Sequence, residues 1–348
     1  LLGGEASPLE GFDIGGGTPS LIQPDRIAEL VRRVKGAFTL GPGFAMSIET
    51  TPRLAALHPD RLAAYRACGI DRISMGLQMT NPRLLRRYGR EGNRPRHNHR
   101  AVANIRAAGF HSFNIDLMYG LAHQTEEDLA NALRLTMELG PDHITLYRMR
   151  YKGTTIAGEA GRVELDRVVA MYNLSRSMLL HGGYLAPPGK NTFTRISGDS
   201  GASAYLTARV ERSTPYLGLG LGAQTFTNNV LAYNLGAASK RLDAYLAASE
   251  EQALPIQDLY HLPQEEGMAK MVSVSFYFGA VDRQAFQARF GVALEKRFAR
   301  EVRFLQRRGL CSLDPDALRM TRQGAMAFSG VLALFYSPRV QDHLVNLS

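Results

Sequence analysis

A short stretch near the N-terminus, Phe12-Asp13-Ile14-Gly15-Gly16-Gly17-Thr18-Pro19-Ser20, decides the fold. Its first three residues are typical of a strand. The three glycines that follow allow a sharp turn in which bare backbone can come close to a ligand. We therefore predict a strand that ends in a binding loop.

The chain repeats this pattern as far as about residue 150. Short apolar runs alternate with longer segments of helical period, which predicts parallel strands covered by helices. Five strands are too few for an eight-stranded barrel, so the sequence is compatible with two folds, a partial barrel and an open doubly wound sheet. The predicted strands are 12–14, 44–48, 72–77, 112–118 and 143–148, and the predicted helices are 24–35, 60–67, an interval at 82–108, and 126–139.

Polar residues follow the predicted strands at the point where each one ends. Glu49, Gln78, Asp116 and Arg148 occupy these positions after or late in the second to fifth strands. Each carboxylate alone could be a helix cap or part of a surface ion pair. The carboxyl ends of parallel strands meet at one edge, where such folds bind ligands. The shared position therefore favours a site.

Composition limits the possible partners and compartments. No apolar stretch approaches the roughly 20 residues that span a bilayer, and we expect a cytoplasmic protein that binds no membrane. The net charge of +9 is spread along helices without a recognition motif, which favours an anionic small molecule over nucleic acid. The two cysteines, Cys68 and Cys311, are too far apart in sequence for a metal motif, and His97 and His99 are expected to be solvated.

Three regions are predicted. Residues 1–150 form the barrel, residues 151–263 an extension that covers the substrate, and residues 264–348 a winged-helix-like domain of helices followed by a hairpin, with Thr321 capping a further helix. The alternating glycines and leucines of 217–223 lack the spacing of a dinucleotide-binding loop. They predict a closely packed strand and turn.

Four motifs resemble one family. They are the glycine stretch, residues 71–78 (DRISMGLQ), residues 114–121 (NIDLMYGL) with Gln124-Thr125, and the later Gly-Leu repeat. Together they resemble the oxygen-independent coproporphyrinogen oxidases and their relatives in the radical S-adenosylmethionine (SAM) superfamily. The resemblance implies a partial (β/α)6 barrel, in this chain without its first βα unit, that holds SAM and a [4Fe-4S] cluster.

The family's CxxxCxxC motif is absent from the chain. We expect its cysteines upstream of Leu1, so that no residue from Leu1 onward binds the metal. A degenerate homologue and a cluster-free binding module are the alternatives.

The resemblance also assigns roles to residues in the SAM pocket. Gly15, Gly16, Gly17 and Thr18 would receive the SAM amino group. The ribose and the sulfonium would be bound by Glu49, Gln78 and Asp116, the carboxylate by Arg90, and the adenine by backbone groups of Met149.

Residues 188–193 and 220–226 resemble the methylating members of secondary metabolism (class C), some of which form cyclopropanes. That likeness implies two SAM molecules and transfer of a methyl or methylene group to an sp2 carbon of a small molecule, with Tyr205 and Gln224 lining the second SAM or the substrate. Oxidative decarboxylation of coproporphyrinogen and haem chaperoning are the alternatives. A flavodoxin or ferredoxin would donate electrons, and a methyltransferase-like enzyme is a further candidate partner.

Overall fold

The computed structural model describes residues 8–346, which divide into two compact units. The barrel unit comprises residues 8–186 and 191–207, and the C-terminal unit comprises residues 187–190 and 208–346. Helix α8 (Ala204–Glu211) belongs to both. The boundaries expected at residues 150 and 263 stay predictions.

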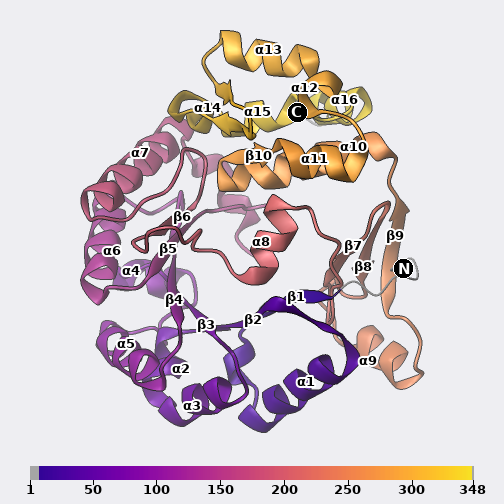
Figure 1. Cartoon of the computed structure of the whole chain (residues 1–348). Coiled ribbons are helices and arrows are strands. Elements are labelled where there is room, and N and C mark those ends of the chain that lie inside the picture. Colours follow the sequence, from indigo (N-terminus) through magenta and orange to yellow (C-terminus); the bar gives the residue numbers. More distant parts are fainter. Residues whose placement is uncertain (1–7, 347–348) are drawn as a thin grey trace. The chain divides into compact units, whose positions relative to one another are not determined.

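The barrel unit contains a six-stranded sheet in the order β1-β2-β3-β4-β5-β6 (Figure 1). Strands β1 to β5 are parallel, and β6 is antiparallel to β5. All five predicted strands are confirmed, and the consecutive order is that of a partial barrel. The strands are β1 (Leu9–Ile14), β2 (Leu40–Thr50), β3 (Arg72–Gln78), β4 (Ser112–Tyr119), β5 (His143–Arg148) and β6 (Thr192–Thr194).

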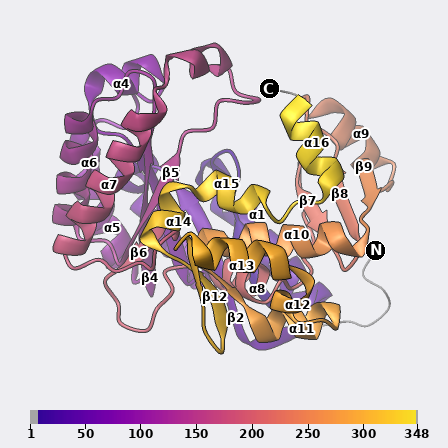
Figure 2. The ribbon, with the colours of Figure 1, turned by 90° about the horizontal axis from the view of Figure 1, so that it is seen from above.

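Helices follow these strands at the four predicted intervals, and a further helix at 52–57 was not predicted. Figures 1 and 2 both place α6 beside α7, and the two helices are in contact. The interval at 82–108 forms two helices, because the chain turns at Gly89 (φ 64°) and restarts at Pro95. The helices are α1 (Pro24–Ala37), α2 (Pro52–Leu57), α3 (Pro59–Ala67), α4 (Pro82–Arg87), α5 (Pro95–Ala108), α6 (Glu126–Leu139) and α7 (Leu165–His181), with short 3-10 helices η1 (Pro19–Leu21) and η2 (Ala157–Arg162).

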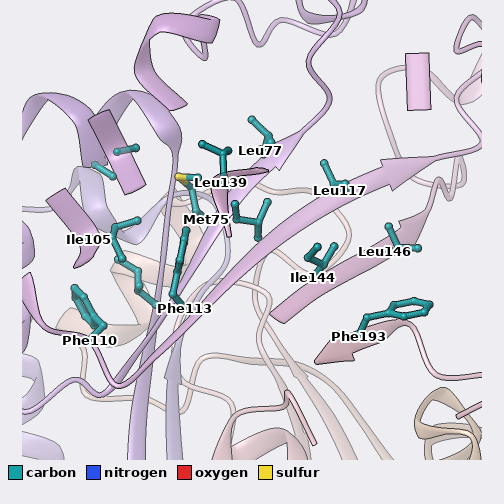
Figure 3. Close-up of a cluster of buried hydrophobic side chains, with 14 of the residues drawn as sticks. Met75, Leu77, Ile105, Phe110, Phe113, Leu117, Leu139, Ile144, Leu146 and Phe193 are labelled. Atoms are coloured by element: carbon teal, nitrogen blue, oxygen red, sulfur yellow. The ribbon is translucent and has the colours of Figure 1, made fainter. Parts of the chain in front are cut away.

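The two faces of the sheet differ in polarity. In β3, Ile73, Met75 and Leu77 are fully buried in the hydrophobic core. Figure 3 shows Met75 and Leu77 within this core. The residues between them, such as Ser74, are polar or small and only half-buried. Successive side chains of a strand point to opposite faces, so the apolar face packs on the helices and the polar face lines the lumen of the barrel.

The C-terminal unit contains two three-stranded sheets, β7-β8-β9 and β10-β12-β11. Its later part shows the expected order of helices followed by a hairpin, and Thr321 accepts a hydrogen bond from the Gly324 N–H at the start of α14. Its elements are β7 (Gln224–Phe226), β8 (Val230–Asn234), α9 (Asp243–Glu250), β9 (Ile256–His261), α10 (Gln264–Ser275), η3 (Phe276–Phe278), β10 (Ala280–Asp282), α11 (Arg283–Phe290), α12 (Leu294–Arg297), α13 (Ala299–Arg307), β11 (Cys311–Leu313), β12 (Ala317–Met320), α14 (Arg322–Met326), α15 (Phe328–Ala333) and α16 (Pro338–Asn346).

The strand expected within 217–223 is wrong, because these residues form a loop before β7. The expected close packing is present. A Cβ at Gly218 would lie 2.4 Å from the Gln224 carbonyl oxygen, so no larger residue fits there. Across residues 8–346, no helix is long and apolar enough to cross a membrane.

Candidate functional site

A hydrogen-bonded row of polar side chains crosses the lumen face of the sheet. Asp116 accepts hydrogen bonds from Ser74 (2.9 Å) and from the Asn114 amide (2.7 Å). The Thr145 hydroxyl donates to the Asn114 side-chain oxygen (2.9 Å) and lies 3.2 Å from the Thr192 hydroxyl. The row connects β3, β4, β5 and β6, and the strands therefore hold Asp116 in a defined orientation.

Residues 199–205, which we call the lumen segment, pack against the same face. Gly201 accepts a hydrogen bond from Arg72 through its carbonyl (2.8 Å), and Ser203 donates to Asp13 (2.6 Å). A Cβ at Gly201 would lie 3.1 Å from the His143 ring. Because Arg72 and His143 begin their strands, the lumen segment covers the N-terminal ends of β3 and β5.

The glycine loop after β1 and the carboxylate of Glu49 are in contact. The Gly16 N–H donates to Glu49 Oε2 (3.3 Å), and a Cβ at Gly15 would lie 2.7 Å from Glu49 Oε1. Gly16 and Gly17 have φ values of 82° and 60°, and no atom lies within 4 Å of the place where either would carry a Cβ. The loop therefore needs glycine for its conformation and leaves open space beside it.

The acids of this region lie close enough to influence one another. Burial raises the pKa of Glu49, and the nearby Asp116 and Asp13 raise it further, while the Gly16 N–H lowers it. Burial likewise raises the pKa of Asp116, against the hydrogen bonds from Ser74 and Asn114. Such a group of acids favours a cationic ligand, and SAM offers both an ammonium and a sulfonium.

Gln78 is held in a strained conformation at the end of β3. Its φ is 64°, in the left-handed region that non-glycine residues rarely adopt, and the pairing of β3 with β4 is irregular between Gly76 and Gln78. Its buried Oε1 has no hydrogen-bond partner within residues 8–346. Strain together with an unsatisfied polar atom makes Gln78 a candidate ligand contact.

Arg90 lies in the loop between α4 and α5, where it is half-buried. Burial lowers the pKa of its guanidinium, and no carboxylate in the described part of the chain forms an ion pair with it. A half-buried cation of this kind can accept an external carboxylate, ideally in two parallel hydrogen bonds.

Met149 follows β5, and its N–H donates to the Tyr119 carbonyl (2.8 Å). Its side chain packs against a small apolar cluster that includes Met79 and Leu121. Of its backbone groups, the carbonyl is therefore the better candidate to meet an adenine.

The two residues expected to line a second SAM or the substrate belong to different units. Tyr205, in the barrel unit, presents its backbone to Gly11, where a Cβ would lie 2.2 Å from the Tyr205 nitrogen. Gln224, in the C-terminal unit, has its side chain held between the hydroxyls of Tyr216 and Tyr233. The roles of Tyr205 and Gln224 stay predictions.

Sequence reasoning missed the residues that support Asp116. Ser74, Asn114 and Thr145 lie within strands, whereas the rule that found the other site residues concerns strand ends. The sequence did contain a signal for these residues. In strands whose apolar face is covered by helices, polar residues alternate with the apolar ones. The phenol of Tyr147 lies in the same region, where burial, with Asp116 and Glu49 next in effect, raises its pKa.

The described residues do not provide the ligands of an iron-sulfur cluster. Cys68 lies in the barrel unit and Cys311 in the C-terminal unit, where burial raises the pKa of the Cys311 thiol to about 12. No group of three His, Cys, Asp or Glu residues between positions 8 and 346 could hold a metal ion. The expectation that His97 is solvated is wrong, because His97 is buried and its Nδ1 lies 3.0 Å from the Gly92 carbonyl oxygen.

Known proteins match both units. Residues 2–136 match the family model of the radical SAM superfamily, and residues 278–327 match that of the HemN C-terminal domain. The solved structure of coproporphyrinogen III oxidase (HemN) from Escherichia coli shares the fold, with a TM-score of 0.75, 23% identity, and coverage of 94% of this chain and 77% of that one.

Residues 2–136 are therefore similar to the radical SAM superfamily, a match that implies SAM and a [4Fe-4S] cluster. More particularly, the chain is similar to HemN-type oxidases and HemW chaperones. It is 28% identical to an oxygen-independent coproporphyrinogen III oxidase of Cereibacter sphaeroides (90% of this chain, 73% of the relative) and 27% identical to the heme chaperone HemW of Haemophilus influenzae (94% and 83%). These relatives do not support the narrower expectation of a class C methyltransferase or cyclopropanase.

Proposed function

We propose that this protein is a radical SAM enzyme that oxidatively decarboxylates propionate side chains of a reduced tetrapyrrole, as the name of its oxidase relative suggests. The observation that carries the proposal is the group of polar side chains at the carboxyl ends of the strands. There the acids around Glu49 lie beside an open glycine loop, while Arg90 lacks an ion pair in residues 8–346.

Each of the expected site residues suits one part of SAM. When SAM is bound and reduced, it supplies a carbon-centred radical that abstracts a hydrogen atom. Glu49 and Asp116 would attract the cationic end, Gln78 would offer its free Oε1 to a ribose hydroxyl, and Arg90 would bind the carboxylate. Side chains held by neighbouring strands fix the position of the ligand, which is the main contribution of a protein to such chemistry.

The test is anaerobic incubation of the reconstituted protein with a reductant, SAM and coproporphyrinogen III. We expect carbon dioxide and vinyl products to form together with 5'-deoxyadenosine. Methyl-deuterated SAM provides the control, because methyl transfer would place deuterium in the 5'-deoxyadenosine. Deuterium there, with no carbon dioxide, would overturn the proposal in favour of methyl transfer.

Haem chaperoning is the second candidate. It is favoured by one comparison: the chain covers 83% of the HemW relative and 73% of the oxidase. A chaperone would give a stoichiometric haem absorbance band without consuming SAM. This measurement, made on the same preparation, separates the two functions.

A further inference from the structure

The start of α5 carries charge of the same sign as the end of its helix dipole. Its N-cap residue is Arg94, and Arg96 and His97 lie in its first turn, which contains no acid. None of the residues that the structure describes caps this helix through a side chain. The N-terminus of a helix is partially positive, so cations at this end cost stability. Helix α6 begins in the opposite way, with the Thr125 capping box and three acids.

A pocket of about 390 Å³ opens at the start of α5, within the barrel unit. Part of its wall is α2, which contacts α5 and lies beside it in Figure 1. The volume is within the range of small-molecule sites, about 300–1,000 Å³. None of the residues assigned to SAM lines this pocket, so it is a separate candidate site.

Three guanidiniums and one carboxylate line the pocket. Arg53 belongs to α2, Arg94 and Arg96 belong to the start of α5, and Glu91 is the acid. The three arginines are exposed, and within residues 8–346 none of their guanidiniums forms an ion pair or a hydrogen bond. Even if Glu91 offsets one of them, two positive charges are left. A phosphate monoester, which carries about −1.5 to −2 at pH 7, would balance them.

His97 adds a directed polar atom to the pocket wall. The residue is only 8% exposed, and its Nδ1 lies 3.0 Å from the Gly92 carbonyl oxygen. Because a carbonyl oxygen can only accept, Nδ1 holds the proton, and Nε2 of the neutral ring is an acceptor. No residue in the described part of the chain donates a hydrogen bond to Nε2. It can therefore accept one from a hydroxyl group of a ligand.

Gly92 joins the two sides of the pocket. Its carbonyl oxygen holds His97, and a Cβ on Gly92 would lie 3.6 Å from Arg53 Nη1. The loop before α5 therefore packs directly against the side chain from α2. This contact holds the arginine of one helix close to the histidine of the other.

We propose that this pocket binds a small phosphate ester that also carries a hydroxyl group, such as a sugar phosphate. Arg94 and Arg96 bind the phosphate at the helix N-terminus, where an anion removes the electrostatic cost described above. Arg53 binds it from α2. His97 Nε2 accepts the hydroxyl, and the half-exposed Leu57 packs against the carbon atoms of the ligand. The inference is independent of the proposed function, because it uses none of the residues assigned to SAM.

The first test titrates the whole chain with ribose 5-phosphate and follows the ligand by 31P NMR. Arg94→Met should bind about tenfold or more weakly, because a hydrogen bond between charged groups is lost. Arg26→Met is the control, since Arg26 is an exposed arginine of α1 without an ion pair in residues 8–346. It should stay within about threefold of the native protein. Equal binding by Arg94→Met and the native protein, or no binding by either, overturns the proposal.

Leu57→Trp distinguishes a ligand inside the pocket from an anion that is merely attracted to surface arginines. Leu57 is 45% exposed at the pocket wall, so a larger side chain there takes up space without removing a charge. We expect the affinity for ribose 5-phosphate to fall about tenfold. An unchanged affinity would show general attraction of anions without a site, and it would overturn the proposal.

Methyl phosphate tests the role of His97. This ligand has the phosphate ester but no hydroxyl, and it should bind about threefold to tenfold more weakly than ribose 5-phosphate, as expected for one neutral hydrogen bond. Equal affinities for the two ligands would overturn the proposed ligand class.

Discussion

At the scale of single residues, the site combines features that cost stability. Glu49 and Asp116 are carboxylates whose pKa values burial raises, and Gln78 carries backbone strain. None of these features would stabilise the fold in the absence of a ligand. Their presence together at one end of the barrel is best explained by a ligand that compensates for them.

Glu49→Gln should weaken SAM binding and also stabilise the protein. Because the pKa of Glu49 is raised in the folded state, the folded protein gains stability as pH falls through that pKa, and the ionised carboxylate costs stability at neutral pH. Removing the charge removes this cost. Calorimetry should show SAM affinity about tenfold lower and a higher Tm at pH 7.

Glu126→Gln is the matched control, since Glu126 is an exposed acid in the first turn of α6 and is not one of the residues assigned to SAM. It should leave SAM affinity unchanged. A Glu49→Gln variant that binds SAM as the native protein does would remove Glu49 from the site.

The proposed contact between Arg90 and the SAM carboxylate can be tested by changing the ligand. Arg90→Met should lower the affinity for SAM by about tenfold to a hundredfold, because a charged hydrogen bond contributes about 1.5–3 kcal/mol. It should have little effect on decarboxylated SAM, which lacks the carboxylate. Equal losses for both ligands, measured by equilibrium dialysis, would show that Arg90 acts on the fold of its loop instead.

At the scale of elements, sequence periodicity was sufficient for the five parallel strands of the barrel. The five parallel strands were predicted because short apolar runs alternate with segments of helical period, whereas the short helix α2 was not predicted. Strands β6 and β10 were missed because each has three residues, too few to show alternation. Glu49, Gln78 and Asp116 were found by a rule about strand ends. Ser74 and Asn114 lie within strands, so this rule did not find them.

Two glycines in the barrel unit should respond oppositely to alanine. A Cβ at Gly11 would lie 2.2 Å from the Tyr205 backbone nitrogen, so Gly11→Ala must push the lumen segment away from β1. We expect a loss of about 1–3 kcal/mol. Gly36 lies in α1 with no atom near its Cβ position, and Gly36→Ala should stabilise by about 0.5–1 kcal/mol. Urea unfolding measures both values, and destabilisation by Gly36→Ala would contradict this account.

At the scale of the whole molecule, the division into units does not follow the order of the chain. Residues 187–190 belong to the C-terminal unit although barrel residues precede and follow them. Gly279 (φ 84°) faces the Pro188 carbonyl oxygen, which a Cβ would approach to 2.4 Å. Composition and periodicity could not predict that residues 187–190 belong to the C-terminal unit, because this assignment depends on contacts between distant segments.

Gly279→Ala should therefore loosen the C-terminal unit at residues 187–190. Gly291→Ala is the control, because Gly291 also has a positive φ (71°) but no atom within 4 Å of its Cβ position. Both variants bear the backbone strain, and only Gly279→Ala adds the clash. Hydrogen exchange should rise at residues 189–190 and in β12 for Gly279→Ala alone. Equal changes in both variants would show that strain, and not the contact with Pro188, is responsible.

The lumen segment also has a consequence for how the chain folds. Asp13 and Ser203 are separated by 190 positions, and Arg72 and Gly201 by 129. During synthesis, the first five strands leave the ribosome well before the residues that complete their interior. Contacts between such distant positions slow folding, since a long loop must close before they can form. A nascent chain that stops short of residue 201 would thus lack the hydrogen bonds that Gly201 and Ser203 make with Arg72 and Asp13, and the polar lumen of its barrel would stay open to water.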